Sequence, residues 1–527
     1  MNDNKTNELI HSIGRRGWIG WSMVLAAAMT LYGFTLAPDI VWQDQGDYQV
    51  QAANCNLSRP GDVVRIHPLF IVVAHGIGRL GWFSYAYGAN LTSAIFAALA
   101  AANVFLLTYR LTGGIWPGIL SAGTFGMAHS VWFLGVQAQT YSMSNAAISG
   151  GLLLFLDYLS SEKSKPLLWM GLVFGLGISA HNISQIAFAV IFIWMVIRWL
   201  RGQLTGTTLA GIVVAWFIGA GLLWYVAAKE YVRNGDLWGT ILSALWGRWG
   251  NAVWNVDKLP MLLKQSGMFF ALNFPTPLVL LAIPGLFESF RPANSRRLGW
   301  FWLTVTVLYA LFAVRYDVPN QNNFFLPMYM MVSLYIGLGF ADFAGRYRSM
   351  WTIVSAILLT AIPATYPILS ERAEALQFNL GTRRHIPYRD EYPYYLIPWQ
   401  QNQTGPRRLA TELFERLPDN AVVLADMTTL AGLQYVHQIE QRRQDLRILT
   451  LETTTDQLLA LLSKQSGRLF TLSNVAGYHP RWARDFRPYP LSDSEQIWEI
   501  ERPKPSENPE EYEPGTLSSI MGPFKQF

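Results

Sequence analysis

The sequence predicts a polytopic α-helical membrane protein with about eleven transmembrane helices, followed by a small α/β domain outside the membrane. Of the 527 residues, 51% are apolar and only 14% are charged, whereas soluble proteins average about 25% charged. The charge is also uneven, since 39 of the 75 Asp, Glu, Lys and Arg residues follow Ser370. We therefore expect a membrane domain over 1–370, a soluble domain over 371–502, and a Pro- and Glu-rich disordered tail over 503–527.

The membrane domain is divided into apolar segments of about 20 residues, the length that spans the hydrocarbon core of a bilayer. The first segment follows Arg15 and Arg16 and is longer than the apolar core of a signal peptide, so we expect a retained anchor. The eleven expected spans are 18–37, 89–109, 114–134, 140–158, 167–181, 183–200, 207–228, 267–287, 299–314, 324–342 and 349–369.

The distribution of Lys and Arg predicts the orientation. Short cytoplasmic loops are rich in these residues. With the N-terminus in the cytoplasm, the outside connection near 315–323 carries only Arg315, and an odd number of spans puts the C-terminal domain outside. The apolar segment 67–82 is short for a span, so we read 39–88 as one long first outside loop, partly at the interface. The cytoplasmic connections then hold Arg15, Arg16, Arg110, Lys163, Lys165, Arg198, Arg201, Arg291, Arg296, Arg297, Arg346 and Arg348.

The C-terminal part alternates short β-branched runs with amphipathic segments, which predicts a small α/β unit. The expected strands are 421–426, 447–452, 468–473 and 496–502. The expected helices are 407–417 and 455–466.

Several classes of function lack support in the sequence. The net charge is only +5 and the basic residues are dispersed, so we expect no nucleic-acid partner. Cys55 is the only cysteine, so it cannot form an internal disulfide. The motifs of nucleotide hydrolases, zinc proteases and serine hydrolases do not occur.

The most informative polar residues are Asp44 and Asp47, directly after the first span. Carboxylates three residues apart share one face of a helix. Partial desolvation beside a membrane surface would make one of them a stronger base. The alternative interpretation is a solvated loop with a helix-capping aspartate.

Other polar residues are expected at the same outer face. Arg65 and His67 precede Pro68, which on a structural interpretation only begins an interfacial helix. Polar residues at the ends of spans are costly and usually functional, and their convergence on one face favours a site there. The further candidates are Gln137, Gln139, Tyr141, His181, Asn182, Arg315 and Asp317.

A series of motifs resembles a known family. In their order and spacing they are similar to bacterial members of a membrane family of unknown function that is related to the eukaryotic transmembrane protein O-mannosyltransferase. The resemblance extends to about residue 450. The motifs are Leu36-Ala37-Pro38, Trp42-Gln43-Asp44-Gln45-Gly46-Asp47, His67-Pro68, Asn90-Leu91-Thr92-Ser93-Ala94, Val136-Gln137-Ala138-Gln139-Thr140-Tyr141, Tyr316-Asp317-Val318-Pro319, Asn323-Phe324-Phe325-Leu326-Pro327 and Tyr388-Arg389-Asp390-Glu391-Tyr392.

This resemblance implies a fold and an activity. The family resembles the GT-C superfamily of glycosyltransferases, which implies a GT-C-like fold in a bacterial inner membrane. It also implies a polyprenyl-phosphate sugar donor and an acidic residue in the first outside loop. Asp44 would take the first Asp of the family's Asp-x-Gly-Glu pattern and Asp47 its Glu, and His67 and His181 would match polar histidines. Two departures are that Gln139 replaces the usual Glu and that Asp47 is shorter than Glu.

The implied chemistry makes Asp44 the general base that takes the proton of an acceptor hydroxyl while the sugar phosphate leaves. Arg65, Arg79 or Arg315 would bind the phosphate. The sugar is open, with mannose indicated only by the eukaryotic relatives, and the acceptor is a protein, a lipid or a glycan. We assign no metal ligand, although a divalent cation at Asp44, Asp47 and His67 is compatible with the residue types. A transporter or lipid-linked-sugar flippase, or a non-catalytic scaffold, are the alternative functions.

Overall fold

The structure is a computed structural model that describes residues 10–247, 258–291, 296–318, 320–344, 348–380, 384–451, 453, 455–462 and 467–502. Several expectations therefore lie outside the described residues: the tail 503–527, the end of the expected helix 455–466, Arg346 and Pro319.

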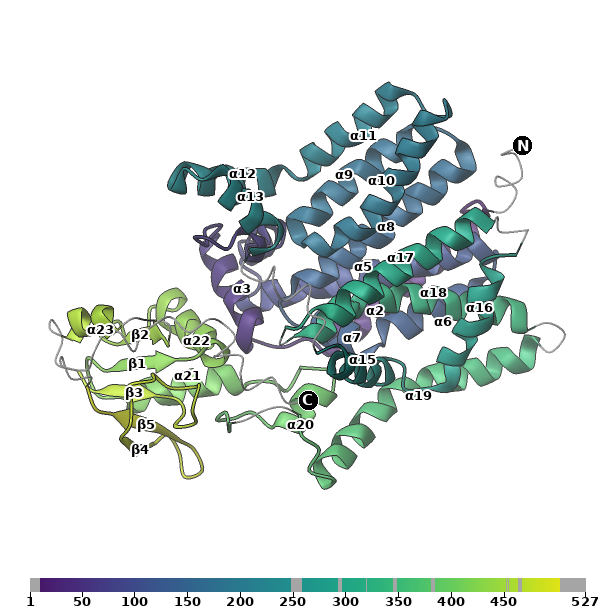
Figure 1. Cartoon of the computed structure of the whole chain (residues 1–527). Coiled ribbons are helices and arrows are strands. Elements are labelled where there is room, and N and C mark those ends of the chain that lie inside the picture. The colour runs from purple at the N-terminus through teal and green to yellow at the C-terminus, as the bar shows by residue number, and fades with distance from the viewer. Residues whose placement is uncertain are drawn as a thin grey trace.

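The described residues up to Ala375 form a bundle of helices (Figure 1). Short 3₁₀ turns interrupt them at Val63–Arg65, Asn182–Ser184, Pro277–Leu281 and Gln321–Phe325. The helices are α2 (Arg15–Phe34), α3 (Gln43–Asn54), α4 (Pro68–Gly78), α5 (Tyr85–Thr112), α6 (Ile115–Gly126), α7 (His129–Gly135), α8 (Thr140–Ser161), α9 (Lys165–Ala180), α10 (Gln185–Leu200), α11 (Gly206–Gly219), α12 (Gly221–Asn234), α13 (Leu237–Leu245), α15 (Leu259–Asn273), α16 (Ala282–Glu288), α17 (Arg296–Arg315), α18 (Leu326–Phe343) and α19 (Arg348–Ala375).

The bundle is that of a multi-pass membrane protein. Among the described residues, six helical segments are long and apolar enough to cross a bilayer, or eight if each of two bent pairs is one span. Each of the eleven expected spans lies on helical residues, but α9 has only 16 residues, and three of the spans are broken rather than straight. Among the described residues between α2 and α5, no helix is long enough to span a bilayer. The apolar helical segment there is the shorter Val63–Gly78.

The expected span 114–134 is broken between α6 and α7, because other helices satisfy the backbone groups at the break. The hydroxyls of Tyr32 and Tyr366 donate hydrogen bonds to the carbonyls of Gly126 (2.8 Å) and Met127 (2.7 Å). The amide of Ser130 donates to Asn273 Oδ1 at 2.7 Å. Helix ends need such partners when they are buried, and partners from distant helices cannot be predicted from an apolar run.

The expected spans 207–228 and 267–287 are also bent. Helices α11 and α12 meet at 65°, and α15 meets the Pro277–Glu288 segment at 107°. Proline explains the second bend, since Pro275 and Pro277 follow α15 directly and cannot continue a helix. The first bend follows Gly219, whose missing side chain lets α11 approach α9 so closely that a Cβ would lie 2.3 Å from the Leu172 carbonyl oxygen.

The C-terminal part contains a five-stranded sheet in the order β2-β1-β3-β5-β4. Strands β2, β1 and β3 are parallel, and β5 is antiparallel to both of its neighbours, β3 and β4. The four expected strands are all present. Sequence reasoning missed β4 because Pro488 and Pro490 argue against a strand, but prolines are tolerated at a sheet edge. The elements are α20 (Glu391–Leu396), α21 (Gly405–Arg416), β1 (Val422–Ala425), α22 (Met427–Gln434), β2 (Arg447–Thr450), α23 (Thr455–Leu462), β3 (Leu469–Thr471), β4 (Phe486–Pro490) and β5 (Gln496–Ile500).

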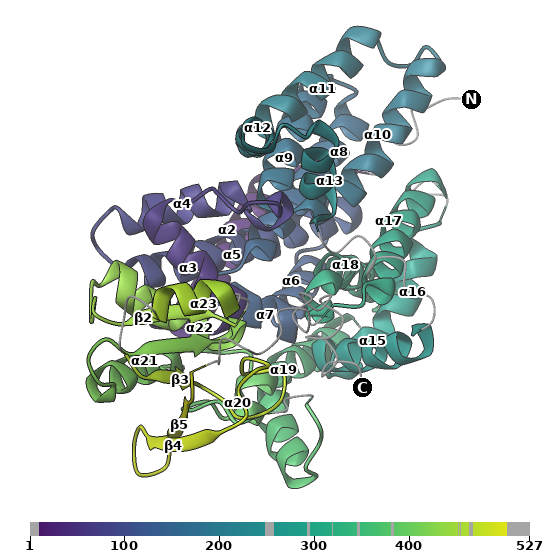
Figure 2. The ribbon, with the colours of Figure 1, turned by 60° about the vertical axis from the view of Figure 1, so that its left-hand side comes forward.

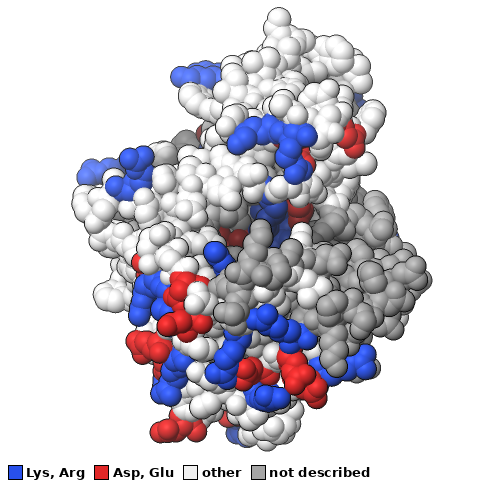
Figure 3. All heavy atoms as spheres, turned by 90° about the vertical axis from the view of Figure 1, so that its left-hand side faces the viewer, with Lys and Arg blue, Asp and Glu red and all other residues white. Residues whose placement is uncertain are grey.

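The two parts of the molecule differ in surface charge and meet at α3. Charged side chains gather over the C-terminal sheet region, whereas the face above it is mostly uncharged (Figure 3). Helix α3 lies between the bundle and α22 in both ribbon views (Figures 1 and 2). Helix α22 approaches so closely that a Cβ on Gly46 would lie 2.9 Å from Ala431 Cβ. The helix that carries Asp44 is therefore covered by the C-terminal part.

Candidate functional site

The segment between α2 and α5 contains the helix that carries both candidate carboxylates. Helix α3 begins after the buried, extended Trp42 and ends at Cys55, whose left-handed backbone closes it. Asp44 lies in the first turn, where the partial positive charge of a helix N-terminus favours a carboxylate. Because Asp47 follows one turn later, the two carboxylates lie on one side of the helix.

Each carboxylate has an arginine partner from the following loop. Arg65 Nη2 donates to Asp44 Oδ1 at 3.2 Å, and Arg65 Nη1 lies 3.5 Å from Asp62 Oδ2. Arg59 pairs with Asp47, which also accepts a hydrogen bond from Gln51 at 2.9 Å. The Asp44 side chain is the more exposed carboxylate, at 36% against 23% for Asp47. Sequence reasoning proposed Arg65 but missed Arg59 and Asp62, because loop residues give no periodic signal.

The phenol of Tyr48 lies behind these ion pairs. Burial raises its pKa, the charge of Asp44 raises it further, and the charges of Arg65 and Arg59 lower it. Because this buried hydroxyl is within electrostatic range of both ion pairs, the carboxylates border the protein interior on that side rather than solvent. In such surroundings charge interactions are stronger than in water.

His67 is held rigidly beside the acidic pair. It begins α4 with a left-handed φ of 50°, and its ring stacks on His181 with a centroid separation of 4.9 Å and an interplanar angle of 12°. A ring nitrogen lies within hydrogen-bonding reach of the Ala180 backbone. Burial lowers the pKa of His67 well below its usual value of 6.5, so the ring is neutral at pH 7. A neutral ring can donate or accept a hydrogen bond but cannot neutralise a phosphate.

Tyr141, His181 and Phe324 extend this wall of rings. The His181 ring centroid lies 4.5 Å from that of Tyr141 and 6.0 Å from that of Phe324. His181 Nδ1 accepts a hydrogen bond from the amide of Ile183 at 3.1 Å, which fixes the ring at the end of α9. The structure thus brings together residues that are up to about 180 positions apart in the sequence.

Gln139 is bound into the backbone of the bundle. Its side chain accepts a hydrogen bond from its own neighbour, the amide of Thr140, at 3.0 Å. Its backbone amide and carbonyl both bond to Ser93 Oγ, at 2.7 and 3.0 Å. These contacts give the beginning of α8 a fixed position. Substrate binding by Gln139 stays a prediction.

The other two arginines predicted to bind phosphate, Arg315 and Arg79, lie on other elements than Arg65. Arg315 ends α17, and the adjacent Asp317 pairs with Lys258, which sequence reasoning missed. Arg79 is exposed and follows α4, whose 11 residues extend about 16 Å from His67. Arg65 is therefore the one of the three predicted phosphate clamps with a direct contact to Asp44.

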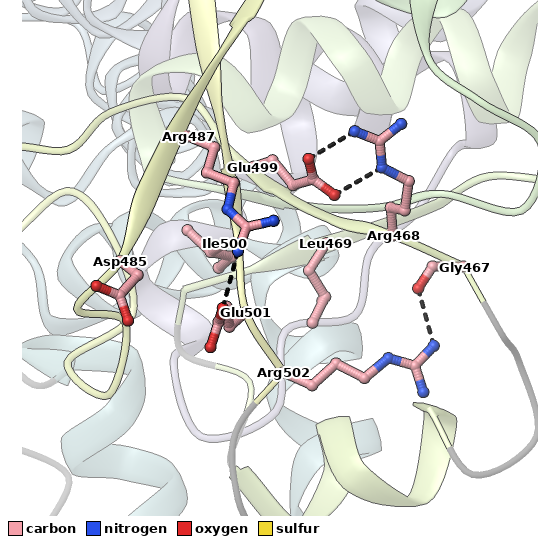
Figure 4. A pocket seen from close by; sticks show the side chains of 9 residues that line it. All are labelled: Gly467, Arg468, Leu469, Asp485, Arg487, Glu499, Ile500, Glu501 and Arg502. Atoms are coloured by element: carbon pink, nitrogen blue, oxygen red, sulfur yellow. Dashed lines mark hydrogen bonds and ion pairs between the residues drawn. The ribbon is translucent and has the colours of Figure 1, made fainter.

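Neither of two further features adds to this site. Among the residues that the structure describes, no group of three or more His, Cys, Asp or Glu side chains is arranged to hold a metal ion. A hollow of about 370 Å³ lies on the C-terminal sheet (Figure 4), but Arg468 and Arg487 there are paired with Glu499 and Glu501.

Comparison with known proteins identifies relatives of this chain. Residues 66–205 match the family described as Protein O-mannosyl-transferase TMEM260 N-terminal domain. The chain is thus similar to the TMEM260 protein O-mannosyltransferases. The matched residues include His67, Gln139, Tyr141 and His181 but begin after Asp44.

Two curated TMEM260 relatives match over most of this chain. The Protein O-mannosyl-transferase TMEM260 of Mus musculus is 28% identical over 467 residues, which are 82% of this chain and 62% of the relative. The Dictyostelium discoideum protein is 20% identical over 492 residues, which are 82% of this chain and 57% of the relative. The chain thus spans about three-fifths of the length of the TMEM260 proteins it matches.

The fold is similar to a solved structure as well. The crystal structure of ArnT from Cupriavidus metallidurans bound to undecaprenyl phosphate has a TM-score of 0.57 at 12% identity, and it covers 94% of this chain and 100% of ArnT. The apo structure of the same protein has a TM-score of 0.52 at 13% identity, with 92% and 98% covered. The expected polytopic fold with an α/β extramembrane part is confirmed: it is ArnT-like.

Proposed function

We propose that this protein is a membrane glycosyltransferase that moves a hexose from a polyprenyl-phosphate donor to an acceptor hydroxyl, with Asp44 as the general base. The TMEM260 relatives, which are named protein O-mannosyltransferases, support mannose and a protein acceptor. The ArnT structure with undecaprenyl phosphate supports a lipid-phosphate carrier. The observation that carries the proposal is the contact between Asp44 and Arg65, 3.2 Å apart beside neutral His67.

The contact between Asp44 and Arg65 supplies two groups that sugar transfer needs. The acceptor oxygen forms a bond to the anomeric carbon, and its proton passes to the Asp44 carboxylate. The bond from the anomeric carbon to the phosphate oxygen breaks, and the polyprenyl phosphate leaves with the electron pair. An incoming donor phosphate would compete for Arg65, so donor binding would release Asp44 to act as a base.

The remaining residues have supporting roles in this proposal. Asp47 stays paired with Arg59 and keeps the loop closed over α3. His67 and His181, as neutral stacked rings, orient hydroxyl groups, with Tyr141 extending the same wall. Lys258, Arg315 and Asp317 lie at the α17 side and are candidates for contacts to the donor headgroup.

The proposed orientation follows the charge of the loops. The N-terminus lies in the cytoplasm and the C-terminal domain on the outer face, in the periplasm for a bacterial inner membrane. The carrier lipid would lie along the bundle while its phosphate reaches Arg65. The domain boundary near 370 and the roles of all the site residues belong to this proposal.

The test is turnover of radiolabelled polyprenyl-phosphate hexoses by purified protein in lipid, with membrane extract as the source of acceptors. Wild type is expected to release or transfer the sugar, and Asp44→Asn is expected to lower turnover at least a hundredfold, the contribution of a general base. Asp47→Asn should reduce turnover less, because the carboxylate that takes the proton remains.

The matched control is Asp342→Asn, which removes a carboxylate paired with Arg291 near the end of α18. Helix α18 begins beside Phe324 and has 18 residues, so Asp342 lies about 25 Å from the site. Its turnover should equal that of wild type. Full turnover in Asp44→Asn would refute the base assignment, and no turnover with any donor in folded wild type would favour transport.

A further inference from the structure

The residue directly before Asp44 has an unusual backbone. Gln43 begins α3 with a φ of +60°, in the left-handed region that residues with a Cβ rarely adopt. Such a conformation is strained and persists only where the surroundings impose it. Because this residue sets the direction in which α3 starts, its conformation decides where the Asp44 carboxylate lies.

The contacts that hold Gln43 come from the C-terminal part. Burial raises the pKa of the Tyr395 hydroxyl, and the nearby Arg389 and Gln43 side chains lower it. The preceding Trp42 is buried, and the guanidinium carbon of Arg389 lies 5.9 Å from its ring centroid. Gly405 approaches the same ring so closely that a Cβ would lie 2.9 Å from Trp42 Cζ2.

Arg389 and Tyr395 are themselves fixed. Arg389 is buried and donates hydrogen bonds to both carboxylate oxygens of Glu391, at 2.7 and 3.0 Å. Its guanidinium carbon lies 4.9 Å from the ring centroid of Tyr394 and 5.2 Å from that of Tyr395. A bidentate ion pair between aromatic faces leaves little freedom of movement. This unit can therefore impose a strained backbone on the helix that it touches.

The bundle fixes the opposite side of the same turn. Gln49 Oε1 accepts a hydrogen bond from the amide of Val41 at 3.0 Å, and Gln49 Nε2 donates to the carbonyl of Asp39 at 3.1 Å. The same nitrogen donates to Asn90 Oδ1 at 2.9 Å. The turn that precedes Asp44 is thus held between two rigid parts, and only one of them belongs to the membrane bundle.

We propose that Tyr395 and Arg389 are positioning residues that hold Gln43 and Trp42 so that the Asp44 carboxylate faces the reaction centre. The C-terminal part then serves catalysis directly, by setting the geometry of the base. This proposal rests on the proposed function, because it assigns Asp44 the role of base. Misplacing a catalytic group by about 1 Å lowers turnover strongly even when substrate binding is unchanged.

The test uses Tyr395→Phe in the full chain, because it removes one hydroxyl and keeps the ring. Turnover of the lipid-linked donor should fall about 3- to 10-fold in kcat, the contribution of one polar contact, with KM for the donor unchanged. Arg389→Lys should lower kcat further. The matched control is Tyr392→Phe on the same helix, whose hydroxyl donates to the Phe378 carbonyl at 3.1 Å, away from α3. It should behave as wild type.

A double variant separates positioning from general stability. If Tyr395 acts through Asp44, adding Tyr395→Phe to Asp44→Asn should cause no further loss, since the group being positioned has been removed. A role in folding alone would lower the residual turnover again. Equal kcat in Tyr395→Phe and Tyr392→Phe, or an additive loss in the double variant, overturns the proposal.

Hydrogen exchange distinguishes this proposal from the proposed function. Backbone amides from Trp42 to Tyr48 should exchange faster in Tyr395→Phe than in wild type or Tyr392→Phe, whatever the activity. Absent turnover in wild type together with faster exchange would refute the glycosyltransferase assignment and retain the structural half of this inference. Unchanged exchange would overturn the inference even if wild type is active.

Discussion

At the scale of single residues, the candidate site is defined by pairs of side chains that lie 12 to 114 positions apart in the sequence. Asp44 meets Arg65, Asp47 meets Arg59, and His67 meets His181. The ion pairs place charge beside the buried phenol of Tyr48, and the histidine stack supplies neutral hydrogen-bonding groups. A carboxylate, a guanidinium and neutral imidazole rings therefore lie within one small region.

The buried neutral state of His67 predicts a dependence of stability on pH. Its pKa is well below 6.5 in the folded protein, whereas the unfolded chain takes up a proton near 6.5. The unfolded state therefore binds more protons, and the free energy of unfolding should fall as pH drops below about 6.5, by up to about 1.4 kcal/mol per pH unit.

The measurement is thermal unfolding of wild type and His67→Phe in lipid between pH 7.5 and 5. The phenyl ring keeps the stack on His181 but cannot be protonated, so the variant should lose less stability on acidification than wild type. Identical pH dependence in the two proteins would contradict a neutral, buried His67.

At the scale of helices, close approach of backbones decides where elements lie. Helix α3 fits between the bundle and α22 because Gly46 has no side chain, since a Cβ there would lie 2.4 Å from the Val41 carbonyl oxygen. Similar contacts join α16 to α18, where a Cβ on Gly285 would lie 1.8 Å from the Tyr335 carbonyl oxygen. Small residues at helix interfaces are a general feature of membrane bundles.

Gly46→Ala is expected to lower the free energy of unfolding by about 1–3 kcal/mol, the cost of overfilling a packed interior, because the nearest atom is the backbone carbonyl oxygen of Val41 and the next is Ala431 Cβ. Turnover should fall as well, since α3 carries Asp44. The control is Gly33→Ala in α2, where a Cβ would meet nothing within 4 Å. It should be neutral or gain up to about 1 kcal/mol. Equal melting temperatures in the two variants would contradict this packing.

At the scale of the whole molecule, the C-terminal part is attached to the segment before α3 and to the start of α5 by a few directional contacts. Arg407 forms two hydrogen bonds to Asp39, of 2.6 and 2.9 Å, and pairs with Glu440. The backbone amide of Ala86 donates to the Tyr435 hydroxyl at 3.0 Å. These contacts fix the C-terminal part against residues that lead into α3 and α5.

Arg407→Gln is expected to loosen this attachment by about 1–2 kcal/mol, because it removes charge-assisted hydrogen bonds. Limited trypsin digestion of the full chain should then release the C-terminal part about tenfold faster. The matched control is Arg408→Gln, since Arg408 pairs with Glu412 on its own helix and is exposed. Equal digestion rates in the two variants would contradict the contact with Asp39.

Local composition was sufficient for much of the architecture. Long apolar runs predict helices of membrane length because each satisfies its backbone groups internally. The strands β1, β2, β3 and β5 follow from short β-branched runs. Strand β4 was not predicted, because its prolines are tolerated only at a sheet edge and the edge position depends on the tertiary structure. The breaks after α6 and α11 were not predicted for the same reason, since distant tyrosines and close helix packing produce them.

The sequence by itself determined that this chain is a membrane bundle with a charged α/β part, and it singled out Asp44, Asp47 and His67. It could do so because hydropathy, charge and helical spacing are local properties. Only the tertiary structure decided which arginine meets each carboxylate, which ring stacks on His67, and that Tyr395 and Arg389 contact the residues before Asp44. The physical reason is that these contacts join segments up to about 350 residues apart, and their geometry depends on how whole helices pack.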